Sequence, residues 1–78
     1  MPTVLRSGPY RFFFFAADRA EPPHLHVRRD AMVAKVWLED VEIAWNKGFS
    51  ERELNAIVLT VYDHHEMLVR SWHEYFAN

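Results

Sequence analysis

The sequence predicts an α+β fold, in which a small antiparallel sheet over about residues 3–45 carries one long or two short helices, over about residues 50–77, on one face. Three observations favour this fold. The first half contains short segments of β-forming residues, short turns separate these segments, and from residue 50 onward apolar residues recur at three- and four-residue spacing. Short connections favour antiparallel pairing of four or five strands. We expect one domain over residues 1–78.

The first half of the chain reads as a series of strands. Thr3–Arg6 and Tyr10–Ala16 flank a Ser-Gly-Pro turn and predict a hairpin. The four phenylalanines at 12–15 place rings on both faces of the second strand, because successive side chains alternate sides. The loop 17–23 ends in two prolines, which cannot donate to a ladder, so the next strand begins at about His24. The remaining expected strands are His24–Arg28, Met32–Leu38 and Val41–Trp45.

The pattern changes to helical spacing after Ser50. Ser50 and Glu53 have the spacing of a capping box, which indicates a helix N-terminus. A single helix running to Tyr75 would be about 38 Å long, longer than so small a domain is wide. We therefore favour a break near residues 63–65 and two packed helices. The expected apolar stripe consists of Leu54, Ile57, Val58, Val61, Leu68, Trp72, Tyr75 and Phe76.

The composition narrows the class of protein. The chain has 78 residues, 50% of them apolar, and no cysteine. Such a chain is not intrinsically disordered, and it has no disulfide framework or thiolate metal site. Its longest apolar run, residues 12–17, is far shorter than the roughly 20 residues that cross a bilayer. We expect a cytoplasmic protein without membrane contact. Because so small a core is marginally stable, we also expect a homodimer, a partner protein or a metal.

Residues 21–27, with the sequence Glu-Pro-Pro-His-Leu-His-Val, are the most unusual stretch. His24 and His26 alternate with apolar residues, so both rings and Arg28 share one face of a strand. The pair can be structural, it can bind a divalent metal, or it can supply the acid and base of a metal-independent ribonuclease, with Arg28 stabilising phosphorane charge. The last two uses require both rings to reach solvent beside the C-terminal helix.

Three further histidines lie in the helical segment. His65 falls on the buried stripe and is best interpreted as a core histidine bonded to a backbone carbonyl. His73 joins the site only if its helix lies against the face of His24 and His26. Otherwise it is a favourable charge near a helix C-terminus.

Cationic residues are concentrated in the first half of the chain. Residues 1–35 contain six Lys and Arg against three acids, and residues 36–78 contain three against eight. Arg6 and Arg11, with the neighbouring aromatic rings, can form a patch that contacts phosphates and stacks bases of RNA. The phenylalanine run is more typical of a core or an oligomer contact, and Trp37 and Trp45 of packing.

Several motifs in this order resemble a known family. The resemblance runs nearly end to end and is to the small prokaryotic family catalogued as domain of unknown function 4160, in which the EPPHxHV core is specific. The residues that carry it are Met1-Pro2-Thr3-Val4-Leu5-Arg6, Tyr10-Arg11-Phe12-Phe13-Phe14, Glu21-Pro22-Pro23-His24-Leu25-His26-Val27, Ala34-Lys35-Val36-Trp37-Leu38, Gly48-Phe49-Ser50, Glu53-Leu54 and Trp72-His73-Glu74-Tyr75-Phe76.

This resemblance implies a component of a type II toxin–antitoxin module, whose partner is encoded by an adjacent gene. It implies no assigned catalytic residue. The sequence departs from the family at Ala44-Trp45-Asn46, where relatives carry an aliphatic residue in place of Trp45, so an exposed Trp45 would change the partner surface. By position, the signature residues are Glu21, Pro22, Pro23, His24, His26, Trp37 and Trp72.

The leading hypothesis is therefore a toxin-like component that acts on RNA or the translation apparatus through the face of His24 and His26, as a ribonuclease-like enzyme or as a binding protein. The alternatives are a non-catalytic protein-binding module with structural histidines and a small metalloprotein with a divalent metal on His24 and His26. The sequence itself requires no cofactor. Candidate catalytic residues are His24, His26 and Arg28, and candidate binding residues are Glu21, Arg6, Arg11, Trp37, Trp72 and His73.

Overall fold

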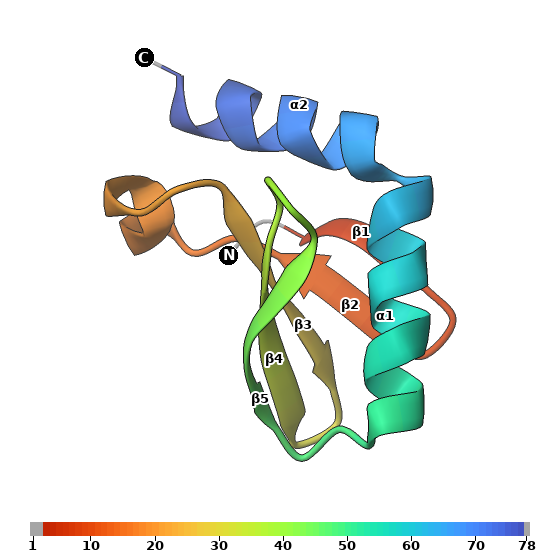
Figure 1. Ribbon diagram of the computed structural model, residues 1–78. Coiled ribbons are helices and arrows are strands. Elements are labelled where there is room, and N and C mark those ends of the chain that lie inside the picture. Colours follow the sequence, from red (N-terminus) through yellow and green to blue (C-terminus); the bar gives the residue numbers. More distant parts are fainter. Residues whose placement is uncertain (1–2, 78) are drawn as a thin grey trace.

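The computed structural model describes residues 3–77 and confirms the α+β fold (Figure 1). Its sheet is antiparallel and has five strands in the order β1-β2-β3-β4-β5, so each strand pairs with its neighbour in sequence. The strands are β1 (Thr3–Ser7), β2 (Tyr10–Phe13), β3 (His24–Arg29), β4 (Met32–Trp37) and β5 (Glu42–Lys47). A 3₁₀-helix, η1 (Ala16–Ala20), precedes β3, and the helices α1 (Glu51–Asp63) and α2 (His65–Phe76) follow the sheet.

The second strand is shorter than the sequence predicts. β2 ends at Phe13, whereas the pattern indicated a strand to Ala16. Phe14 still follows the alternation of the strand, with its ring fully buried in the core and its centroid 5.3 Å from that of Trp72. The ladder stops because the Phe15 carbonyl accepts the Asp18 N–H at 3.0 Å. The chain then forms η1, which is held at its start by the Phe15 N–H donating to the Asp18 carboxylate at 2.8 Å.

The last strand is also displaced from its expected bounds. It begins at Glu42, because Val41 has a left-handed φ of 53° in the β4–β5 connection, and it continues to Lys47. Gly48, directly after this strand, has a positive φ of 104° and turns the chain toward α1. The expectation of a strand starting at Val41 was wrong for this reason.

The first C-terminal helix begins, and the helical segment is interrupted, at the positions that the sequence indicates. Ser50 Oγ accepts the Glu53 N–H at 3.1 Å and caps α1. His64 ends α1 and precedes α2, with its backbone N–H donating to the Thr60 carbonyl at 3.1 Å. Two helices, and not one long helix, are therefore present. Of the helices within residues 3–77, none has both the length and the apolar character required to cross a membrane.

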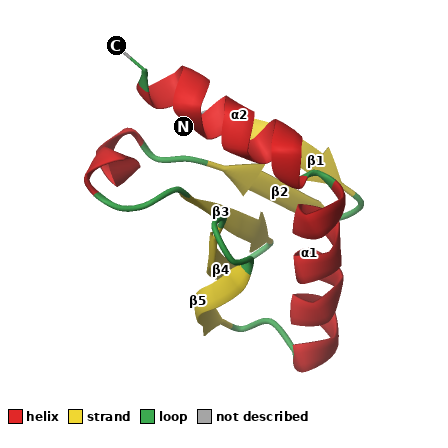
Figure 2. Cartoon of the chain, turned by 45° about the horizontal axis from the view of Figure 1, so that its top comes forward, coloured by secondary structure: helices red, strands yellow, loops and turns green. Residues whose placement is uncertain are grey.

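One face of the sheet carries the core. Figures 1 and 2 show α1 running along the strands, while α2 crosses near their ends. Alternate side chains of the central strands point toward these helices. The residues that are fully buried in this core include Phe12, Leu25, Val27, Ala34, Val36, Ile57, Val61 and Leu68.

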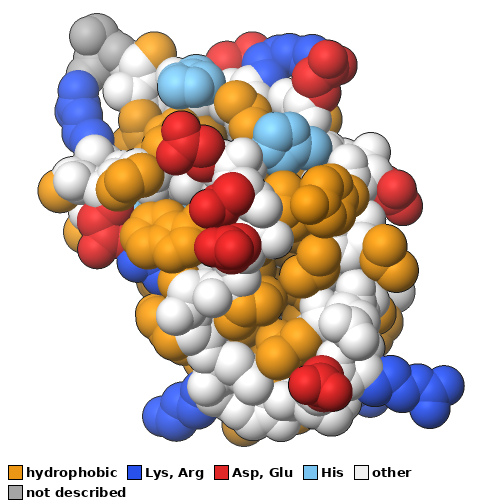
Figure 3. Space-filling model, viewed as in Figure 1, with side chains coloured by type: hydrophobic (Ala, Val, Ile, Leu, Met, Phe, Trp, Pro, Cys, Tyr) orange, Lys and Arg blue, Asp and Glu red, His pale blue; other side chains and the backbone are white. Residues whose placement is uncertain are grey.

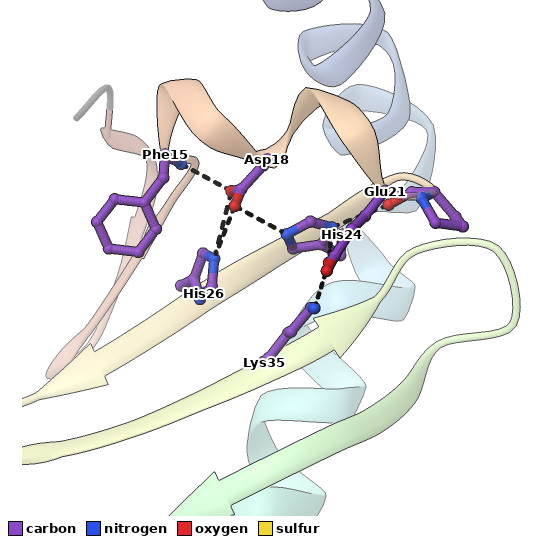
Figure 4. Close-up of polar contacts among 7 residues, drawn as sticks. Phe15, Asp18, Glu21, His24, His26 and Lys35 are labelled. Carbon is purple, nitrogen blue, oxygen red and sulfur yellow. Dashed lines mark hydrogen bonds and ion pairs between the residues drawn. The ribbon is translucent and has the colours of Figure 1, made fainter.

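The side chains that alternate with these core residues define the second face, which we call the open face. Within the described chain neither α1 nor α2 covers the middle of this face, and η1 lies over one end of it (Figure 4). From β1 to β5, the open face carries Arg6, Arg11, Phe13, His24, His26, Arg28, Val33, Lys35, Trp37, Glu42, Trp45 and Lys47.

Candidate functional site

The strand register brings the candidate arginines into one row across the open face. Arg6 pairs with Arg11, and Arg11 pairs with Arg28 on the third strand. Directly paired residues have their Cβ atoms about 5 Å apart on the same side of the sheet, and like charges in such pairs destabilise it. The row continues through Val33 to Lys47 on β5. A band of positive charge thus crosses the sheet at one level.

A second row, directly beside the first, is largely aromatic. Phe13 pairs with His26, and their rings are stacked with centroids 5.6 Å apart. His26 pairs with Lys35, which in turn pairs with Trp45. Phe15, at the start of η1, contacts the His26 ring edge-on at 4.6 Å. Phe15 and Trp45 remain 37% and 44% exposed, so the row presents two rings to solvent.

Cations also lie over the rings of the open face. The Arg11 guanidinium lies 4.6 Å from the centroid of Phe13, and Lys35 Nζ lies 4.4 Å from that of Trp37. Such contacts are attractive because the face of an aromatic ring is negative, and they hold each cation against the sheet. Among the residues that the strand pairing places on the open face, the acidic one is Glu42, which lies opposite Trp37. The Glu21 carboxylate, from the loop before β3, accepts a hydrogen bond from Lys35.

The two histidines of β3 meet a third side chain, Asp18 of η1 (Figure 4). The Asp18 carboxylate lies 3.2 Å from His24 Nε2 and 3.3 Å from His26 Nε2. One ligand atom from each of the three residues lies within 4.8 Å of the others. The side-by-side orientation expected for the two rings is therefore correct, and the chain folds back to place a carboxylate between them.

The two rings do not, however, reach solvent as the sequence analysis expected. His24 is 0% exposed and His26 is 7% exposed. The loop and η1 cover His24, and its ring lies against Trp72 and Trp37 with centroids 5.2 and 5.5 Å away. The ribonuclease triplet required both imidazoles to be accessible beside Arg28, and this structure does not present them so.

Hydrogen bonding fixes the tautomer of a neutral His24. Its Nδ1 lies 2.9 Å from the Pro22 carbonyl oxygen, which only accepts, so Nδ1 carries the proton. Nε2 then bears a lone pair, and this lone pair points toward the Asp18 carboxylate, which is also an acceptor. Among the described residues, His24 Nε2 is a buried side-chain atom without a hydrogen-bond partner.

The protonation states of Asp18 and His26 follow from their surroundings. Burial alone would raise the pKa of Asp18, but the hydrogen bond from the Phe15 N–H, together with the two imidazoles when they are protonated, holds that pKa below its ordinary value of 3.8. Burial lowers the pKa of His26 below its ordinary 6.5, against the opposing effect of the Asp18 carboxylate. At neutral pH the cluster therefore contains an ionised carboxylate beside a neutral His26.

The candidate residues of the helical segment lie apart from this cluster, except for Trp72. His65 Nε2 is 2.6 Å from the Leu38 carbonyl oxygen, which confirms its interpretation as a histidine bonded to a backbone carbonyl. His73 lines a separate pocket with His65, Glu39 and Pro23. On this side of the molecule histidine and acidic side chains gather, with Lys and Arg toward the edges (Figure 3). His73 therefore does not join the face of His24 and His26.

Asp18 is the site residue that the sequence analysis missed. It lies in a loop that the pattern indicated only as polar, six residues before His24. One signal in the sequence could have identified it. Asp18 precedes the His24-Leu25-His26 pair, and two prolines in between restrict the path by which the chain folds back. The 3₁₀ turn, which sets the direction of the Asp18 side chain, has no comparable signature.

Comparisons with known proteins agree with the sequence motifs. Neither a search of curated proteins nor a search of solved structures found a match. A family profile with the description "Domain of unknown function (DUF4160)" matches residues 10–73, which include all of the open face except its β1 strand, together with the Asp18 cluster and Trp72. The chain belongs to this family.

Proposed function

We propose that this protein is the toxin-like component of a cytoplasmic type II toxin–antitoxin module, and that it binds RNA on its open face. The observation that carries the RNA part of this proposal is the direct pairing of Arg6, Arg11 and Arg28 across three adjacent strands. Like charges in this arrangement repel one another and oppose sheet formation. A bound polyanion removes that repulsion, so the arrangement favours an anionic ligand.

The aromatic row supports a nucleic acid over a simple anion. Single-stranded RNA is bound by cations that contact phosphates and by aromatic rings that stack on bases. The open face offers both, with Phe15 and Trp45 exposed one row away from the arginines.

The burial of His24 and His26 favours a structural role for both residues over a catalytic one. Because His24 is fully buried and donates to the Pro22 carbonyl, and Asp18 accepts the Phe15 N–H, we propose that these hydrogen bonds of His24 and Asp18 shape the segment that keeps η1 over the end of the sheet. His26, stacked on Phe13 and beside Phe15, then positions the aromatic row. Arg28 contributes to the cationic row and is fixed by the hydrogen bond from its Nε to the Asp30 carbonyl at 3.0 Å.

The RNA interface can be tested by fluorescence anisotropy with a labelled single-stranded RNA at several salt concentrations. Each phosphate contact contributes about 0.7 to the slope of log K against log salt for single strands. Arg6→Gln and Arg28→Gln should each weaken binding and reduce this slope. Arg52→Gln, which removes an exposed charge from α1, is the matched control and should leave both unchanged. Failure of the wild-type protein to bind RNA would contradict the proposal.

The toxin role has a separate test in cells. Expression of the chain alone should arrest growth, and the Arg6→Gln/Arg28→Gln double variant should relieve the arrest at equal protein level. Co-expression of the product of the adjacent gene should restore growth of cells that express the wild-type protein. Normal growth on strong induction of the wild-type chain alone would exclude the toxin assignment and leave the RNA interface standing.

A second function is favoured by the exposure of two aromatic rings on the open face. If the histidines are structural, the two exposed rings of the open face, Phe15 and Trp45, suit a protein partner that covers apolar surface. In this case the protein is a non-catalytic binding module. Co-purification with the adjacent gene's product, lost in Trp45→Ala and insensitive to ribonuclease treatment, would favour this function over the first.

A further inference from the structure

We propose that Asp18, His24 and His26 bind a first-row divalent transition metal, which ties η1 to strand β3. The inference begins with His24 Nε2, a fully buried nitrogen that lacks a hydrogen-bond donor and faces a carboxylate oxygen at 3.2 Å. Two acceptors in van der Waals contact repel each other. A cation between or beside them converts this repulsion into two favourable interactions.

The distances suit a shared metal ion. Zinc binds nitrogen and oxygen ligands at about 2.1 Å, so two ligands of a tetrahedral site lie about 3.4 Å apart. From the single ligand atom Asp18 Oδ1, the distances are 3.2 Å to His24 Nε2 and 3.4 Å to His26 Nε2. The ligand atoms of the three residues all lie within 4.8 Å of one another, so both imidazoles are within reach of one ion beside Asp18.

The surroundings of the ligands match those of metal-binding histidines. Such a histidine usually donates its second ring N–H to a carbonyl or a carboxylate, which fixes the tautomer and the ring orientation. His24 has this arrangement, with Nδ1 donating to the Pro22 carbonyl at 2.9 Å. Asp18 is fixed in the same way, because its Oδ2 accepts the Phe15 N–H at 2.8 Å. Both ligands are therefore oriented before any metal arrives.

The donor set indicates the class of metal. Two imidazoles and one carboxylate are borderline ligands that suit zinc, iron, cobalt or nickel better than magnesium or calcium, which prefer all-oxygen sites. Three protein ligands leave at least one position for water.

The test uses Zn²⁺ as the probe with the full chain, after removal of metal by a chelator. Calorimetry should give one Zn²⁺ bound per chain. Loss of an outer-shell partner of a metal site costs 10- to 100-fold in affinity, so we expect the ligand variants Asp18→Asn, His24→Gln and His26→Gln each to lose more than about 100-fold. Asp40→Asn, which changes an exposed acid outside the cluster, should bind like the wild type.

Two additional measurements separate loss of the site from loss of the fold. Circular dichroism of each metal-free variant reports whether it is folded, and the visible absorption of Co²⁺ bound to the wild-type chain reports nitrogen and oxygen ligation without any substitution. Nitrogen NMR of the imidazoles in the wild-type protein can contradict the proposal, because it reports which ring nitrogens carry protons and whether they bind the metal. If His24 carries protons on both ring nitrogens and its signals do not change on addition of Zn²⁺, an ion pair with Asp18 accounts for Nε2 and the metal proposal is wrong.

Discussion

Asp18 Oδ1 and His24 Nε2 lie 3.2 Å apart, and when His24 is neutral neither atom carries a hydrogen to share. This contact joins η1 to the first residue of β3 across a loop that contains two prolines. In the metal-free protein it is a local source of instability, because a buried acceptor without a donor costs about 1–3 kcal/mol. Three expected outcomes follow from the cluster and its surroundings, and a fourth concerns a turn.

The variant Asp18→Asn should leave the metal-free protein as stable as the wild type, within about 1 kcal/mol, or make it more stable. The amide has the shape of the carboxylate, so its oxygen can still accept the Phe15 N–H while its nitrogen donates to His24 Nε2. Urea unfolding in the presence of a chelator measures the difference. A loss of about 3–5 kcal/mol would instead identify a buried ion pair with a protonated His24.

Stability of the metal-free protein should fall as the pH decreases below about 6.5. Burial keeps the pKa of His26 below its ordinary value of 6.5 in the folded state, whereas the unfolded chain titrates near that value. Between the two pKa values the unfolded state therefore binds more protons, and acid favours unfolding. The full contribution of His26 to the free energy of unfolding is present above about pH 6.5, and it is lost as the pH falls through the lower pKa of the folded state.

This pH effect is measured from urea midpoints with a chelator present, at several pH values between about 7 and 5. The matched variant is His26→Gln, which has no titrating ring and should show a flatter dependence across this interval. An equal slope in both proteins would assign the acid sensitivity to other groups and remove His26 from the explanation.

The fold was predictable because its signals are local. The alternating apolar residues of β3, the β-forming residues of β4, the cap at Ser50 and the change of period after it each determine an element without reference to distant residues. The break at His64 was predictable from length alone, since a straight helix exceeds the width of so small a domain. The end of β2 at Phe13 and the start of β5 at Glu42 were not predictable, because they depend on backbone hydrogen bonds between Phe15 and Asp18 and on a left-handed φ at Val41.

The site was predictable only in part, for a related reason. That His24 and His26 share a face follows from the period of a strand. Their burial depends on where η1 folds back and on the packing of Trp72 from α2, which are contacts between segments distant in the sequence. The cationic row depends on the pairing register of three strands. The sequence therefore identified the three arginines as candidates but did not predict that they lie opposite one another.

The variant Gly48→Ala should destabilise the protein, and by more than Gly8→Ala does. Both glycines have a positive φ, which costs an alanine about 1 kcal/mol or more. At Gly48 a new Cβ would in addition lie 2.8 Å from Met32 Cγ, whereas at Gly8 nothing lies within 4 Å. Thermal unfolding of the two variants compares them directly. Equal losses would show that Met32 moves aside without cost.

The variant Trp45→Ala should weaken binding of single-stranded RNA by about 1–3 kcal/mol, the usual contribution of one stacked base. Trp45 is 44% exposed at the end of the aromatic row, where its ring is free to stack while its backbone pairs with Lys35. Because the indole carries no charge, the salt slope of binding should stay that of the wild type, in contrast to the arginine variants. Tyr62→Ala removes a ring that is 58% exposed on α1 and should leave the affinity unchanged. If Tyr62→Ala weakens binding as much as Trp45→Ala, RNA does not select the open face, and the surface of β5 is free for a protein partner.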